Sequence, residues 1–270
     1  MDADKEWLDR LSRCSPAVTA WRERATNPEF AVPGSSLHAD EVPGLLSVET
    51  TAWYSMCVAS EHLDFTLDAM RATATMYPTA YFPAVRTAFM GAVNALYLLA
   101  AKTRVERQSR ALRMRADELR AQIVGLKDMA LPEGKPDVAR TEFIDQLRDR
   151  QASLQQAAAA IGNTEDVSRM KFNQTGAVNW VSRYMLHHSD DPMITGAFQT
   201  IWRDGSAAAH GQLQYAIMRM HQNEAVSRES GNTVVHMRGN LSQDVGPAFV
   251  GTVLVLNECF RLYDLRRVKH

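Results

Sequence analysis

Residues 201–212 read IWRDGSAAAHGQ and place an arginine, an aspartate and a histidine around three consecutive alanines. A neutral imidazole at His210 has the chemistry of a general base, and the guanidinium of Arg203 offers a bidentate fork for a phosphate. Asp204 would orient one of the two, and the small residues leave room for a backbone or a second chain to come close. The alternative is structural: His210 is a core histidine, hydrogen-bonded across a tight helix contact that the alanines allow.

The expected local geometry is a junction between two helices. The residues at 204–206, Asp-Gly-Ser, are types that break and cap helices, so we expect Arg203 to end one helix and Ser206 to cap the next. His210 would then lie near the start of the second helix, where the positive end of the helix dipole disfavours imidazolium. The first helix should bury an apolar stripe formed by Ile194, Phe198, Ile201 and Trp202.

Arg203 is followed by Asp204 and, after six intervening residues, by His210, and this pattern resembles the R-x4-6-H motif of HEPN-domain proteins. The resemblance implies an all-α bundle and, in many members, a metal-independent ribonuclease that uses no cofactor. It also implies a homodimer with facing motifs, and a place in toxin–antitoxin, abortive-infection or other antiviral systems, with an antitoxin or regulatory protein as a partner. A second match, from Arg183 to His188, lacks a polar residue after the arginine.

The overall composition gives no sign of a nucleic-acid or membrane protein. The chain has 270 residues, with 30 basic against 31 acidic side chains and a formal net charge of -1, so any basic surface must be local. Its three cysteines are far apart, which favours reduced thiols in a cytoplasm. The most apolar window, 87–101, is shorter than the roughly 20 residues of a membrane span, so we interpret it as a core helix and expect no membrane contact.

Metal chemistry has one candidate stretch, His187-His188-Ser189-Asp190-Asp191. Imidazole and carboxylate are good ligands, but this spacing matches no metal signature. Histidines at the end of one helix, followed by an aspartate that caps the next, explain the stretch without a metal. We therefore expect neither a metal nor a cofactor.

Helical periodicity dominates the chain and predicts an all-α fold, a helical bundle with a long antiparallel coiled-coil-like hairpin inserted. We expect residues 1–46 to form an N-terminal helical extension and loop, and residues 47–270 to form the bundle, with the hairpin at 102–162. Two heptad seams joined by a Pro/Gly turn at 131–136 predict the hairpin. The seam residues are Leu98, Val105, Leu112, Leu119 and Leu126, then Leu147, Leu154 and Ile161.

Several local expectations follow from the residue types. Proline at Ser15-Pro16 should break the helical stretch 3–25, and the three prolines of 26–46 indicate a surface loop. The helix that starts near Tyr77 should continue into the hairpin as one rod. Beyond the motif we expect a helix over 206–221, a short strand at 233–237, and a final helix from Pro247 to Leu265 for which a strand is the alternative. The helix over 206–221 should bury Leu213, Ile217 and Met220.

The expected rod carries a local excess of arginine that would bind RNA phosphates, with Arg107, Arg110 and Arg113 as the central contacts. The alternative interpretation is the solvated outer face of a coiled coil. Two functions of different class therefore remain. One is a HEPN-like RNA-cleaving effector with RNA as substrate. The other is a non-catalytic helical module that binds a partner protein or dimerises through the 102–162 hairpin.

Overall fold

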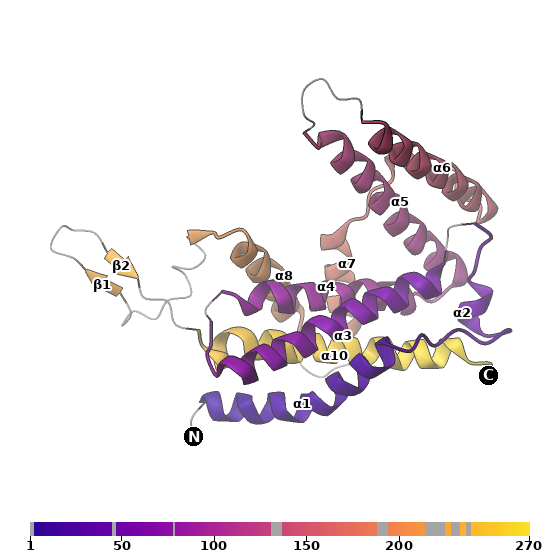
Figure 1. Ribbon diagram of the computed structural model, residues 1–270. Helices are drawn as coiled ribbons and strands as arrows, with labels where there is room; N and C mark the ends of the chain where they lie inside the picture. The colour runs from indigo at the N-terminus through magenta and orange to yellow at the C-terminus, as the bar shows by residue number, and fades with distance from the viewer. Residues whose placement is uncertain are drawn as a thin grey trace. The chain divides into compact units, whose positions relative to one another are not determined.

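The computed structural model describes residues 3–44, 47–77, 79–130, 137–187, 194–213, 225–227, 233–235 and 239–270. Helices make up nearly all of the regular structure in these ranges, which confirms the all-α prediction (Figure 1). The helices are α1 (Ala3–Ala25), α2 (Ser36–Ala39), α3 (Val48–Thr73), α4 (Tyr81–Leu99), α5 (Arg104–Asp128), α6 (Val138–Ala160), α7 (Gln174–Leu186), α8 (Ile194–Ala209) and α10 (Gly246–Arg267). Short helical turns, η1 (Val167–Arg169) and η3 (Leu241–Val245), and strands β1 (Ala225–Ser227) and β2 (Thr233–Val235) complete the order.

The chain divides into two compact units, and each is built from separate stretches of sequence. Unit 1 contains Met1–Glu29, Trp53–Leu96 and Thr175–Arg261. Unit 2 contains Phe30–Ala52, Tyr97–Gln174 and Leu262–His270. The boundary between them falls inside α3, α4 and α10, which contribute residues to both units, and after the first residue of α7.

The core of unit 1 includes most of α4. Its residues Phe89, Ala92, Val93 and Leu96 are completely buried, as expected of a core helix. Among the described helices, only Tyr81–Leu99 is long and apolar enough to cross a membrane, and 61% of that window is buried inside the protein. Such a burial pattern is typical of an internal helix.

Helix α1 runs without a break through Pro16, so the predicted interruption at Ser15-Pro16 is wrong. A proline inside a helix removes one backbone hydrogen bond and costs about 3 kcal/mol. The buried face of α1 offsets this cost, because Val18 is completely enclosed and the Trp21 ring stacks on that of Phe260 with centroids 5.4 Å apart.

The predicted continuous rod is also wrong, because α4 ends at Leu99 and α5 begins at Arg104. Thr103 Oγ1 accepts a hydrogen bond from the Glu106 backbone N–H at 3.2 Å, and the Glu106 carboxylate accepts one from the Lys102 N–H at 3.3 Å. These two bonds resemble a capping box, with the carboxylate reaching the residue before the N-cap, and they start a new helix. Val105, an expected seam residue, is therefore 59% exposed.

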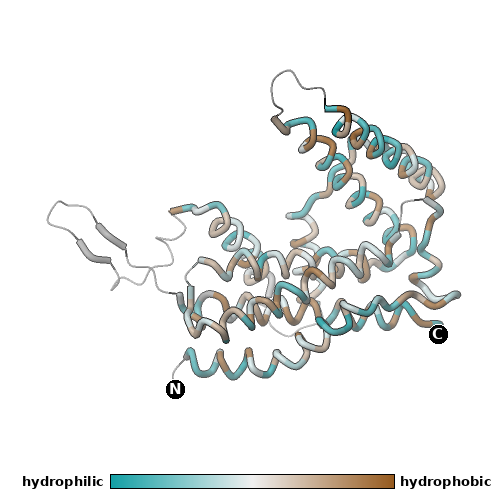
Figure 2. The backbone as a smooth tube through the Cα atoms, viewed as in Figure 1, coloured by the Kyte–Doolittle hydropathy of each residue, from teal (hydrophilic) through white to brown (hydrophobic). Residues whose placement is uncertain are grey.

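Helices α5 and α6 pack against each other within unit 2 (Figure 1). The seam residues Leu112 and Leu119 of α5 and Leu147 and Leu154 of α6 are buried. Figure 2 shows polar and apolar residues interleaved along both helices. The predicted pair of helices is thus present. Its coiled-coil geometry and its status as an insertion stay predictions. The expected turn at 131–136 lies outside the described residues.

The segment expected to be a surface loop, 26–46, has a buried centre. Leu37 and Asp40 have no exposed surface, and Ser35 caps the short helix α2 through a hydrogen bond from the His38 N–H. The prediction failed because the loop carries a carboxylate whose basic partner lies far away in the sequence, as described below.

The C-terminal part of the chain tests two of the predicted elements. Residues 246–267 form the single helix α10, so the strand alternative for this stretch is wrong. Strand β2 pairs antiparallel with β1, with Val226 opposite Val234, and this confirms the predicted strand over 233–235. His236 and Met237, the rest of that predicted strand, lie outside the described residues.

Candidate functional site

The motif helix α8 continues from Ile194 to Ala209 through Asp204, Gly205 and Ser206, so the predicted helix junction at these residues is wrong. Gly205 does not break the helix; it makes room for a neighbour. A Cβ atom at this position would lie 2.5 Å from the Cβ atom of Arg86 in α4. Close packing between α8 and α4 therefore explains the glycine, where sequence alone indicated a turn.

The helix ends at the motif histidine instead of restarting before it. Gly211 has a positive φ of 61°, the Gln212 N–H donates to the Ala207 carbonyl at 3.0 Å, and the Gly211 N–H donates to the Ala208 carbonyl at 3.2 Å. These two bonds form a Schellman motif, in which glycine follows the C-cap residue. His210 is that C-cap residue. The expected helix over 206–221 is therefore wrong at its start, and Leu213 is exposed; Ile217 and Met220 lie outside the described residues.

His210 thus lies at the negative end of a helix, opposite to the positive end that the sequence predicted. The electrostatic argument for a neutral imidazole, which depended on a helix N-terminus, does not hold. The side chains of Arg203 and His210 are both exposed, and Asp204 is half-buried. Exposure of His210 also excludes the alternative in which it is a buried core histidine.

Arg203 and His210 lie on one side of α8. Over seven residues an α-helix rises about 10 Å and rotates by about 700°, which is about 20° less than two full turns. The two side chains therefore leave the helix in nearly the same direction, about two turns apart along its axis. In a single chain, one phosphate can meet both groups only if the arginine extends along the helix toward the histidine. A second chain facing this surface would remove that restriction.

Apolar contacts fix α8 within unit 1. The Phe198 ring packs edge-on against Phe89 of α4 with centroids 5.4 Å apart, and Ile201 lies against Gly251 of α10. Phe198 and Ile201 are buried, which confirms that part of the predicted stripe. Trp202, the last stripe residue, is only half-buried, and its indole ring is covered by the guanidinium of Arg86, whose Cζ atom lies 4.3 Å from the ring centroid.

Arg86 is the residue at this site that the sequence analysis missed. Its Nε atom is buried and makes no hydrogen bond, and no ion pair to Arg86 is present among the described residues. Burial lowers the pKa of its guanidinium. The available signal was an arginine within an otherwise apolar helix, but only the fold places that arginine beside Trp202 and Gly205.

The proposed RNA-contacting arginines do not form one exposed face. Arg107 is 4% exposed; its Nε donates to Asp40 Oδ2 at 2.5 Å and its Nη2 to Asp40 Oδ1 at 2.8 Å. Arg110 is also buried, paired with Glu106, and lies 4.0 Å above the Tyr97 ring. Burial in these pairs leaves neither side chain available at the surface, so the expectation that they contact RNA is wrong for this structure.

Arg113 differs from these two because its side chain is 43% exposed. It forms an ion pair with Glu165, with 2.5 Å between Nη2 and Oε2. An RNA phosphate would have to displace the Glu165 carboxylate from Arg113. Exposed ion pairs contribute little stability, so this displacement would cost little free energy. Of the three predicted contacts, Arg113 alone is accessible.

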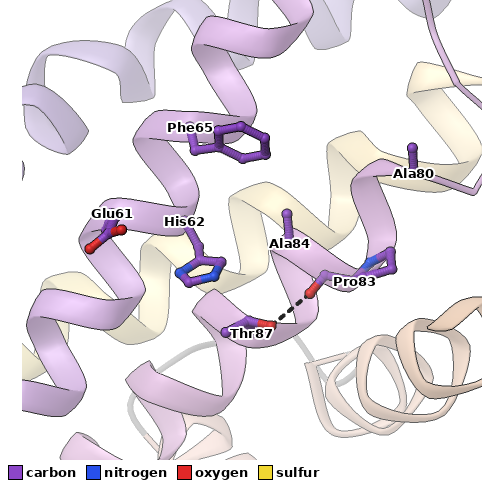
Figure 3. Close-up of a pocket in the computed structure, with 7 residues that line it drawn as sticks. All are labelled: Glu61, His62, Phe65, Ala80, Pro83, Ala84 and Thr87. Atoms are coloured by element: carbon purple, nitrogen blue, oxygen red, sulfur yellow. Dashed lines mark hydrogen bonds between the residues drawn. The ribbon is translucent and has the colours of Figure 1, made fainter.

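A cleft of about 480 Å³ lies elsewhere in unit 1, between α3 and α4 (Figure 3). The Nδ1 atom of His62 lies 3.0 Å from the Val58 carbonyl, which can only accept, so Nδ1–H is the donor of a hydrogen bond between them. Phe65 is 60% exposed. The cleft is lined by Glu61, His62, Phe65, Ala80, Pro83, Ala84 and Thr87.

This cleft contains none of the residues that the sequence singled out. Its lining offers one imidazole and one carboxylate among mostly small or apolar side chains, a lining suited to apolar groups. Within the described ranges, no three His, Cys, Asp or Glu side chains gather as a metal site would require. His188 to Asp191, the core of the stretch considered for metal, lie outside those ranges.

A second polar cluster in unit 1 joins α7 to α10. The Tyr184 hydroxyl donates to Glu258 Oε1 at 2.7 Å, and the same carboxylate accepts two hydrogen bonds from Arg261. Burial, followed by the hydrogen bond to Glu258, raises the pKa of Tyr184 to about 12. The hydrogen bond from Tyr184 of α7 to Glu258 of α10 links the two helices, so this cluster serves to hold them together.

Comparison with known proteins identifies no relative of this chain. The resemblance to HEPN-domain proteins therefore depends on the motif in α8 and on the all-helical fold. No family model, curated protein or solved structure matches the chain.

Proposed function

We propose that this protein is a HEPN-like, metal-independent ribonuclease that acts as a toxin or antiviral effector. His210 removes the proton from a ribose 2′-hydroxyl, and Arg203 stabilises the charge that grows on the adjacent phosphate. Asp204 orients one of these groups. The 2′-oxygen attacks the adjacent phosphorus and the P–O5′ bond breaks, so one product carries a 2′,3′-cyclic phosphate. The leaving 5′-oxygen takes a proton from water and becomes the 5′-hydroxyl of the other product.

One observation supports this proposal above the others: the motif arginine and histidine are both exposed, and they lie on the same side of α8. A buried pair could not reach a polymer such as RNA. Their separation of about two helical turns favours a homodimer, in which the arginine of one chain complements the histidine of the other. Arg113 remains a proposed RNA contact outside the motif.

The test is RNA cleavage in the presence of EDTA by the wild type, His210→Ala and Arg203→Ala. Loss of a general base should reduce the cleavage rate about 10²–10⁴-fold. Because both side chains are exposed, the melting temperature of each variant should match that of the wild type. His187→Ala is the matched control, since His187 is exposed and directly follows the end of another helix, α7.

An RNase activity that survives both motif substitutions, or that falls equally in His187→Ala, would exclude the motif as the catalytic site. Absence of metal-free cleavage in the wild type, on total cellular RNA as well as on defined oligonucleotides, would exclude the ribonuclease. Light scattering should show a dimer at micromolar concentration. A monomer would contradict the shared arrangement of Arg203 and His210.

A second candidate function is a non-catalytic module that binds a protein partner through the α5–α6 pair. The observation that favours it is a set of large apolar side chains left exposed on these two helices, since such groups are often covered by a partner. They are Val105, Val124, Val138 and Phe143. Val124→Glu combined with Phe143→Glu should then abolish partner binding or dimerisation while the protein stays folded by circular dichroism, whereas unchanged assembly would exclude this surface.

A further inference from the structure

We propose that Arg86 is a second phosphate-binding residue of the α8 site and holds an RNA phosphate that flanks the one contacted by Arg203. This inference rests on the proposed function, because it assigns Arg86 to the same substrate. It makes Arg86 a substrate-binding residue in addition to the motif.

The position of Arg86 is set by two residues of α8. The Arg86 guanidinium stacks on the Trp202 ring, with 4.3 Å between Cζ and the ring centroid. The lack of a side chain at Gly205 leaves room for the aliphatic stem of Arg86. Both lie within two residues of Arg203 in the sequence. Arg86 therefore adds a positive charge to the flank of the helix whose exposed side carries Arg203 and His210.

None of the residues that the structure describes accepts a hydrogen bond from Arg86. A guanidinium has five N–H donors, and buried arginines are almost always paired with acceptors. Within the described residues, Arg86 has no hydrogen bond and no carboxylate partner, and its Nε atom is sealed from solvent. The two terminal nitrogens make no described hydrogen bond either, but they are not among the sealed atoms. They are the donors left to an incoming acceptor.

The chemistry of these donors selects a phosphate. Stacking on Trp202 uses the face of the guanidinium, and its edge, which carries the two terminal nitrogens, is the part that binds a phosphate bidentately. The partial burial of Arg86 strengthens such a charge-assisted bond, because the surroundings screen it less than water does. Successive phosphates of one RNA strand could then contact Arg86 and Arg203 in turn.

The experiment measures binding of a fluorescently labelled single-stranded RNA by anisotropy, in EDTA and over a series of KCl concentrations. All proteins carry His210→Ala so that the RNA stays intact. Arg86→Gln should bind about tenfold more weakly at low salt, as expected for loss of a charge-assisted hydrogen bond. The slope of log affinity against log salt should become shallower by about 0.7, the contribution of one phosphate contact in a single strand.

Two further variants separate this role from packing. Arg86→Lys keeps the charge and should keep the salt slope, while its affinity falls because the bidentate fork is lost. Arg13→Gln removes the charge of another exposed arginine in unit 1 and should change neither quantity. If Arg86→Gln does not fold by circular dichroism, Arg86→Lys decides, and wild-type affinity in that variant overturns the inference.

The outcomes also separate this inference from the proposed function. An unchanged affinity and salt slope in Arg86→Gln, alongside metal-free cleavage by the protein with His210 intact, overturns the role of Arg86 alone. A shallower slope without any cleavage by that protein keeps the phosphate site and overturns the nuclease. No RNA binding by any protein overturns both.

Discussion

Replacing Arg107 with methionine should destabilise the protein strongly and leave any RNA binding by the folded chain unchanged. Arg107 of α5 holds the segment 30–44 of unit 2 through its bidentate ion pair with Asp40. It also donates to the Ser36 hydroxyl and to the Ala101 carbonyl, each at 3.2 Å. Methionine keeps the unbranched stem of the side chain but makes none of these bonds.

The magnitude follows from what the substitution leaves behind. The Asp40 side chain has no exposed surface, so its carboxylate would stay buried without its main partner. Removing one member of a buried ion pair typically costs about 3–5 kcal/mol. Arg104 lies 3.8 Å from the same carboxylate but is mostly exposed, so it compensates only in part. We therefore expect a loss of about 3 kcal/mol, the lower end of that range.

The assay is urea unfolding, followed by circular dichroism and by tryptophan fluorescence in parallel, because coincident transitions are needed for a two-state analysis. With an m value of about 3 kcal/mol per molar urea, the midpoint should fall by about 1 M. The double variant Arg107→Met/Asp40→Asn removes both charges and should be more stable than Arg107→Met alone. A surface arginine offers the control: Arg148→Met, whose pair with Asp145 is exposed, should change stability by less than about 1 kcal/mol.

A midpoint within error of the wild type would refute this reasoning, because it would mean that Asp40 and Arg107 are not sealed from water. Weaker RNA binding by a fully stable Arg107→Met protein would go further and restore Arg107 as a surface phosphate contact. The double-variant comparison guards against a trivial packing effect, since a loss due to methionine alone would persist in both proteins.

Three other outcomes follow from the structure. Gly205→Ala should lower the melting temperature, because the new methyl group meets Arg86 and overpacking costs about 1–3 kcal/mol; an unchanged value would mean that α8 and α4 are not in close contact. The pKa of Tyr184, raised to about 12, means that its contribution to stability is present below the ordinary tyrosine range near 10 and is lost as the pH rises from there to about 12. Ultraviolet titration should show this, and Glu258→Gln should lower the midpoint only in part, because burial is the larger cause. Burial also raises the pKa of the Cys259 thiol well above its usual range, so Cys259 should react with a thiol reagent only after unfolding, and rapid labelling of the native protein would contradict its burial.

The helices were predictable where burial on one side repeats along the chain. In α7, Val178, Val181 and Met185 recur at helical spacing and are buried, and the residues Leu112 and Leu147 of the predicted hairpin seam are buried too. Such patterns are local, and they survive any arrangement of the helices that buries the same side. The division between α4 and α5 was also readable, since threonine three residues before glutamate is a helix-start signal, but the heptad spacing obscured it.

The candidate site was less predictable because its geometry depends on distant residues. Local propensity indicates a turn at Gly205, yet Arg86 occupies the space that the missing side chain leaves, and the helix continues. In the same way, arginine on a long helix indicates a solvated face, yet Asp40 takes Arg107 into the interior. Tertiary contacts of this kind override propensities worth less than about 1 kcal/mol per residue.

The sharing of α10 between the two units has a consequence for biosynthesis. Phe260 completes the aromatic stack with Trp21 in unit 1, and the Arg267 carbonyl accepts a hydrogen bond from the Val32 N–H in unit 2. Domains usually fold in order as the ribosome releases them. Here neither unit can close its core before α10 has emerged from the ribosome, so both units depend on the same helix to finish folding. The nascent chain keeps apolar surface exposed until α10 is made, and loss of α10 would disable both units together.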